Sequence, residues 1–65
     1  MEENSVFEDF MGKPVKAAYR DGNQFKIARG NLISIQNGFL KIRGNLGTIV
    51  INENNIDKMS FLKGG

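Results

Sequence analysis

The residues best suited to chemistry in this sequence are an aromatic ring and two cations close together in the second half of the chain. Phe39, Lys41 and Arg43 alternate with apolar residues in one short stretch, so in a β-strand all three would share a face. This combination suits a single-stranded nucleic acid, whose bases stack on rings while its phosphates attract cations. The alternative is that Phe39 belongs to the core and that the two cations are only solvent-exposed side chains further along the same strand.

Amide side chains form a second group of candidates, because an amide both donates and accepts hydrogen bonds at base edges. The candidates are Asn52, Asn54 and Asn55. The alternative for all three is a role in the turn itself, since asparagine tolerates left-handed backbone conformations.

Enzymatic chemistry has few residues to support it. The chain contains no cysteine and no histidine, so the usual thiol nucleophile, general base and metal ligands are missing. Glu53 and Asp57 flank a turn, where charged side chains are common. The segment 44–47, "GNLG", lacks the lysine and hydroxyl residue of a phosphate-binding loop. We therefore expect no catalytic residues, metal site, cofactor or small-molecule substrate.

Charge is unevenly distributed along the chain. The formal net charge is +2, yet seven basic residues and one acidic residue lie between Lys13 and Arg43. A basic central segment favours binding of a polyanion such as nucleic acid. The alternative is that these side chains are only the solvated faces of strands, where lysines keep sheet edges from pairing with other chains. The absence of cysteine is typical of the cytoplasm, and no apolar run is long enough to span a membrane. We expect a cytoplasmic protein without membrane contact.

The elements that position these residues follow from capping signals and periodicity. Ser5 and Glu8 have capping-box spacing, and an apolar face follows them. Gly12 and Pro14 end the pattern. The sequence therefore predicts an α-helix over residues 5–12 that docks its apolar face on the rest of the domain.

Period-two alternation from residue 14 to residue 62 predicts five short strands joined by tight turns. Gly30 interrupts the second strand and predicts a sharp bend. Tyr19 shares a face with other apolar residues and is expected in the core, and the apolar run 48–51 is expected to be buried on both faces. Five open strands would leave unpaired edges. We therefore expect one mostly β domain over residues 1–65, in which a short N-terminal α-helix precedes a five-stranded, strongly bent antiparallel small barrel.

This order of elements resembles the Sm-like fold of Sm, Lsm and Hfq proteins, an SH3-like roll. The resemblance covers residues 6–62 and rests on "ARGNLISI", "GFLKIRG" and "IVINENNI". In the last of these, Ile51 and Ile56 keep the spacing of the second family motif. Asn52 and Glu53 stand where the archaeal and eukaryotic form of that motif has arginine and glycine.

In Sm-like proteins the motif residues form a uridine pocket in a ring of subunits, and the fourth strand of one subunit pairs with the fifth of the next. The resemblance implies a non-enzymatic module that binds RNA or single-stranded nucleic acid as a homo-oligomer through its last two strands. Because the polar motif residues differ, the alternative is a protein-interaction or assembly module without RNA binding. The residues expected at the nucleic-acid site are Gln36, Asn37, Phe39, Lys41, Arg43, Asn52 and Asn54.

Overall fold

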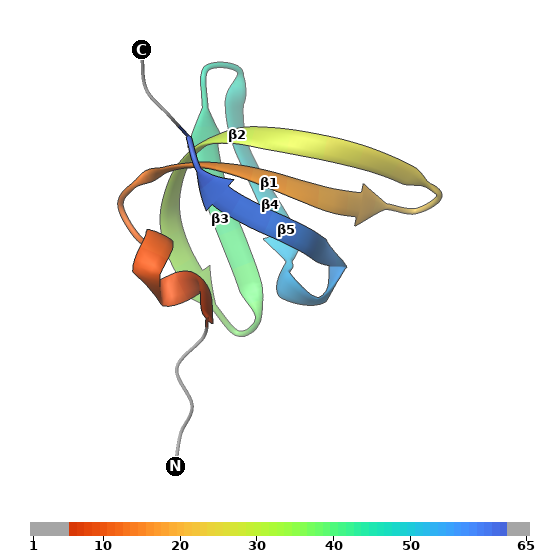
Figure 1. Cartoon of the computed structure of the whole chain (residues 1–65), viewed down its shortest axis with the longest axis horizontal. Helices are drawn as coiled ribbons and strands as arrows, with labels where there is room; N and C mark the ends of the chain where they lie inside the picture. Colours follow the sequence, from red (N-terminus) through yellow and green to blue (C-terminus); the bar gives the residue numbers. More distant parts are fainter. Residues whose placement is uncertain (1–5, 63–65) are drawn as a thin grey trace.

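One antiparallel sheet makes up most of the computed structural model, which describes residues 6–62 (Figure 1). The elements in chain order are the 3-10 helix η1 (Val6–Phe10), β1 (Pro14–Asp21), β2 (Gln24–Gln36), β3 (Phe39–Gly44), β4 (Gly47–Asn52), the 3-10 helix η2 (Glu53–Asn55) and β5 (Ile56–Phe61). The strand order across the sheet is β4-β3-β2-β1-β5. The predicted mostly β fold with five antiparallel strands is confirmed.

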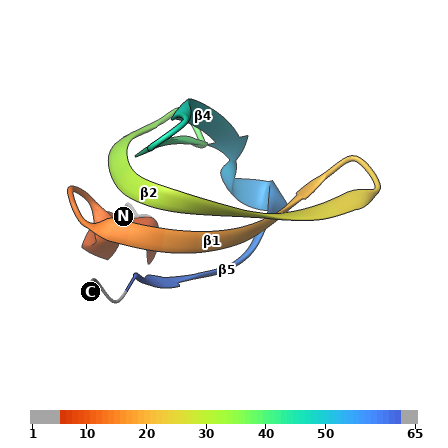
Figure 2. The ribbon, with the colours of Figure 1, turned by 90° about the horizontal axis from the view of Figure 1, so that it is seen from above.

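The sheet is bent, but it is not closed into a barrel, so that part of the prediction was wrong. Figure 2 shows β2 curling so that its two ends follow different directions. β4 and β5 lie at the two opposite edges of the sheet. The chain passes between these edges through η2 rather than through a hairpin, and among the five described strands β4 and β5 are not paired with each other. Two strand edges therefore stay open.

The bend in β2 coincides with a change of partner strand at Gly30. Gly30 pairs with β1. The next residue, Asn31, is the last residue of β2 that pairs with β1 and the first that pairs with β3, where it lies opposite Arg43. A Cβ atom at Gly30 would overlap the carbonyl oxygen of Arg43, and one at Gly44 would lie 2.6 Å from the carbonyl oxygen of Arg29. Close backbone approach therefore requires glycine at both positions, as predicted for Gly30.

The core lies on one face of the bent sheet. Its buried residues are Val15, Ala17, Ala28, Leu32, Leu40, Ile42 and Ile51. Tyr19 and Ile56 are half-buried against this core, which confirms the expected core position of Tyr19. Phe7 and Phe10 dock η1 on the same cluster. Side chains at alternate strand positions point to the opposite side of the sheet, which we call the outer face.

The N-terminal helix is shorter and tighter than predicted. The structure has a 3-10 helix over Val6–Phe10 instead of an α-helix over 5–12, and Ser5 of the predicted capping box lies outside the described residues. The Gly12 N–H donates a hydrogen bond of 2.7 Å to the Leu32 carbonyl. Because this bond already ties the chain to β2, the helix ends before it can complete the predicted two turns. Among residues 6–62, no helix is long and apolar enough to cross a membrane.

The apolar run 48–51 is buried on one side only, so the prediction of two buried faces was wrong. Ile51 is buried, whereas the side chain of Ile49 is 38% exposed and that of Val50 is 58% exposed. The reason is the open sheet: β4 is an edge strand, and within the described part of the chain it pairs with β3 alone. Its outer side therefore stays in contact with solvent.

Candidate nucleic-acid interface

The predicted aromatic and basic residues lie together on the outer face of β3. This strand buries Leu40 and Ile42 and exposes Phe39, Lys41 and Arg43. The Phe39 side chain is 45% exposed, so it is not part of the core, and the alternative interpretation of this residue is wrong. The alternation that was read from the sequence is confirmed.

Cross-strand pairing surrounds these three residues with neighbours from β2 and β4, all of them polar except Val50. Residues directly opposite each other in an antiparallel sheet share a face and have Cβ atoms about 4.5–5.5 Å apart. The pairing gives three rows, namely Gln36–Phe39–Asn52, Ser34–Lys41–Val50 and Asn31–Arg43–Thr48. We call these nine residues the β3 patch. Four of them were not among the residues predicted from the sequence: Asn31, Ser34, Thr48 and Val50.

A hollow of about 310 Å³ lies over the β3 patch and the turn beside it. Its lining residues are Ser34, Gln36, Asn37, Phe39, Lys41 and Val50. Four of the predicted site residues thus meet in one place, and Arg43 lies two positions further along β3 on the same face. Asn37 has a φ of 52° in the β2–β3 turn, a conformation that asparagine tolerates, so it also serves the turn.

Asn52 and Asn54 serve the elbow between β4 and β5. The Asn52 Oδ1 atom accepts a hydrogen bond of 2.8 Å from the Asn54 backbone N–H and thereby caps η2. The neighbouring Glu53 N–H donates a hydrogen bond of 2.8 Å to the Gly38 carbonyl, which ties the elbow to the β2–β3 turn. Asn52 lies opposite Phe39 in the sheet, but its amide oxygen is already occupied by the cap.

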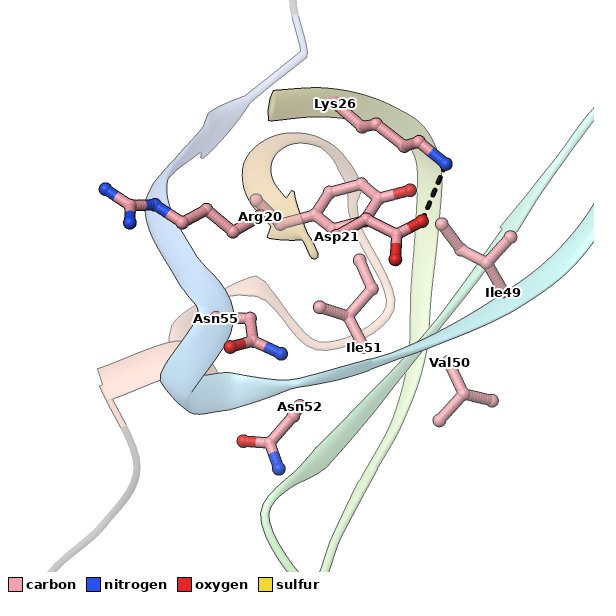
Figure 3. Close-up of a pocket in the computed structure, with 9 residues that line it drawn as sticks. Arg20, Asp21, Lys26, Ile49, Val50, Ile51, Asn52 and Asn55 are labelled. Atoms are coloured by element: carbon pink, nitrogen blue, oxygen red, sulfur yellow. Dashed lines mark hydrogen bonds and ion pairs between the residues drawn. The ribbon is translucent and has the colours of Figure 1, made fainter. Parts of the chain in front are cut away.

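A second hollow, of about 380 Å³, lies between the β1–β2 hairpin and β4 (Figure 3). The Lys26 ammonium and the Asp21 carboxylate form an ion pair of 2.6 Å on one side of it. The hydrogen bond and the negative charge of Asp21 raise the pKa of Lys26. Ile49 and Ile51 line the opposite side. Because the ammonium of Lys26 is already paired, this hollow suits a phosphate less well than the β3 patch does.

Replacing Asn52 tests whether its main contribution is the cap. Asn52→Ala removes the acceptor and is expected to cost about 1 kcal/mol of folding free energy, which lowers the Tm by roughly 4–8 °C in a domain of this size. Asn52→Asp keeps an oxygen at the same place and is expected to retain the wild-type Tm. Thermal unfolding followed by circular dichroism measures both. An equal loss in the two variants would rule out the cap as the cause.

Comparisons with known proteins do not assign a family to the chain. It matches no protein-family model, no curated protein and no solved structure. In the part of the chain that the structure describes, no three acidic, cysteine or histidine side chains are grouped so that they could hold a metal ion. The features of the chain that point to a function are therefore the geometry and charge of its outer face.

Proposed function

We propose that the protein is a non-enzymatic, Sm-like module that binds RNA, or another single-stranded nucleic acid, on the β3 patch. The observation that carries this proposal is the joint exposure of Phe39, Lys41 and Arg43 on one strand face. The ring of Phe39 offers a stacking surface to a base. The ammonium and guanidinium groups beside it make charge-assisted hydrogen bonds to phosphates.

The composition of the β3 patch supports a polyanionic ligand with unpaired bases. None of its nine residues is acidic, and two are basic. Gln36 and Asn31 offer amides that pair with base edges, which are accessible in single strands. A base must leave its duplex stack before it can stack on Phe39, so the exposed ring favours a single strand over a double helix.

The resemblance to Sm-like proteins supports RNA as the leading ligand. The long bent β2 with Gly30 at its partner change, and the short elbow before β5, agree with the positions that carry the resemblance. The arginine and glycine of the family motif are replaced by Asn52 and Glu53. We therefore assign the binding surface to β3 rather than to the elbow.

Truncating Phe39 tests the proposed function. Base stacking on an aromatic side chain contributes about 1–3 kcal/mol, so Phe39→Ala is expected to weaken binding of a 12-nucleotide uridine-rich RNA by about 5- to 150-fold. Fluorescence anisotropy at low salt measures the affinity. Leu46→Ala is the matched control, because Leu46 is a fully exposed apolar residue outside the β3 patch. Equal affinity of both variants and the wild type would refute a stacking role for Phe39.

Self-assembly is a second candidate function, and the apolar residues at both open edges of the sheet favour it. Ile49 and Val50 are exposed on β4, and Phe61 is 53% exposed on β5. An edge strand presents unpaired backbone N–H and C=O groups to another chain. We propose that β4 of one copy pairs with β5 of the next, which would cover both edges in a homo-oligomer.

The mass of the protein in solution tests this assembly. We expect a multiple of the 7.3 kDa chain mass at tens of micromolar in sedimentation or light-scattering measurements. Val50→Glu places a charge on the β4 edge, at a residue that is 58% exposed, and is expected to shift the mass toward the monomer. Leu46→Glu introduces the same charge at an exposed turn and should leave the mass unchanged. A wild type that runs as a monomer would exclude assembly through these edges.

A further inference from the structure

The outer face continues from the β3 patch across β2 onto β1 and β5. Arg29 and Asn31 lie two positions apart on β2, at the bend. Arg29 pairs with Lys16 of β1, whereas Asn31 pairs with Arg43 of β3. Basic residues therefore follow one another across the bend, and the surface of the β3 patch does not end at β2.

The outward positions on this second arm of the sheet are basic or apolar, with one serine. They follow from the pairing of β1 with β2 and β5, and they are Lys16, Ala18, Arg20, Phe25, Ile27, Arg29, Lys58 and Ser60. We call these eight residues the hairpin face. Four of them are cations, so the hairpin face and the β3 patch together carry six cations. An exposed carboxylate, that of Asp57, lies next to Lys58 in β5, at the register shift between β1 and β5.

The hairpin face contains a hollow of about 260 Å³ with an apolar floor and a basic rim. Ala18 lies between Lys58 and Ile27 in one cross-strand row. Its short side chain leaves a depression between these longer neighbours. Lys16 and Ser60 complete the lining. A flat ring with a negatively charged group beside it fits this arrangement.

A stacking platform lies beside this hollow. The guanidinium carbon of Arg20 lies 5.1 Å from the centre of the Phe25 ring, which is a cation–π contact. The Phe25 side chain is nevertheless 64% exposed, and it is not part of the core cluster. Aromatic rings and guanidinium planes both stack on unpaired bases.

We propose that the hairpin face holds a second segment of the single-stranded nucleic acid whose first segment occupies the β3 patch. This inference rests on the proposed function. One base occupies the hollow over Ala18, another stacks on Phe25, and Lys16 and Lys58 contact phosphates. The hollow and the Phe25 ring are two sites of the size of a base, and cations lie beside both. This arrangement matches a single-stranded nucleic acid, in which bases and phosphates alternate. An anionic membrane surface would use the cations but would leave the stacking platform without a partner.

Two sets of variants test the second segment with a 12-nucleotide uridine-rich RNA. Lys16→Gln with Lys58→Gln removes two phosphate contacts, so we expect at least about tenfold weaker binding and a salt slope that is shallower by about 1.4, since each contact on a single strand contributes about 0.7. Ala18→Ile fills the hollow without changing charge, and isoleucine is well suited to a strand. We expect it to weaken binding about fivefold or more at an unchanged salt slope.

The control pair is Lys13→Gln with Lys26→Gln, which removes the same charge at positions outside both faces. If the wild type does not bind the RNA, the proposed function fails and this inference with it. A second outcome is that the wild type binds the RNA and Phe39→Ala weakens this binding. If the Lys16/Lys58 double variant and Ala18→Ile then leave the affinity and the salt slope unchanged, the inference alone is wrong. Wild-type binding to phosphatidylserine-containing vesicles without binding to the RNA would make a membrane the occupant and overturn both.

Discussion

Gly30→Val is expected to lower the thermal stability of the protein sharply. A Cβ atom at this position would overlap the carbonyl oxygen of Arg43 and lie 2.9 Å from the Cα atom of Gly44. Both neighbours are backbone atoms, which cannot turn aside as a flexible side chain can. β2 and β3 must therefore separate at the bend. We expect a loss of about 1–3 kcal/mol, which corresponds to a fall in Tm of roughly 4–24 °C.

The matched control for Gly30→Val is Ile33→Val, three residues further along β2. Ile33 is 41% exposed, and valine is β-branched like isoleucine. A substitution at such a surface position usually changes stability by less than about 0.5 kcal/mol, so the Tm should change little. Calorimetry or circular dichroism measures both variants. A Gly30→Val protein as stable as the wild type would contradict the close approach of β2 and β3 at the bend.

The double variant Lys41→Glu, Arg43→Glu is expected to lose RNA binding almost completely. Both side chains point outward from β3 beside Phe39, and both of the proposed phosphate contacts of the β3 patch come from them. The variant removes these contacts and puts repulsive carboxylates in their place. We expect a loss of affinity on the order of 100-fold at low salt, while the buried residues of β3 keep their packing.

A control with the same change in net charge separates the β3 patch from overall charge. Lys13→Glu with Lys26→Glu changes two cations that lie elsewhere. The Lys13 ammonium is 5.6 Å from the centre of the Phe61 ring, and Lys26 pairs with Asp21. If both double variants lose the same affinity, binding follows the net charge and the β3 patch is not the site.

The local parts of this fold could be predicted from the sequence, because they depend on neighbouring residues. The turn signal Asn37–Gly38 and the alternation after it are enough to place Phe39, Lys41 and Arg43 on one face. The register further along the same hairpin could not be predicted. An irregularity between Leu32 and Ser34 places Asn31 opposite Arg43, and no turn signal marks it.

The long-range parts of the fold were the ones that sequence reasoning missed. Whether β4 meets β5 depends on the curvature of the whole sheet, and the prediction of a closed barrel failed on that point. The hairpin face was missed for a related reason. The pairing of Arg20 with Phe25 follows from the local turn between β1 and β2. The position of Lys58 beside Ala18 follows from the pairing of β1 with β5, which joins distant parts of the chain.

The salt dependence of wild-type binding to a 12-nucleotide uridine-rich RNA tests the central claim most directly. Each phosphate contact on a single strand contributes about −0.7 to the slope of log K against log salt. The outer face predicts a slope of about −1.4 if the β3 patch binds alone, and of about −2.8 if Lys16 and Lys58 of the hairpin face also contact phosphates. No binding at about 50 mM salt, or an affinity that does not change as salt rises, would contradict the assignment of a nucleic-acid ligand to this face.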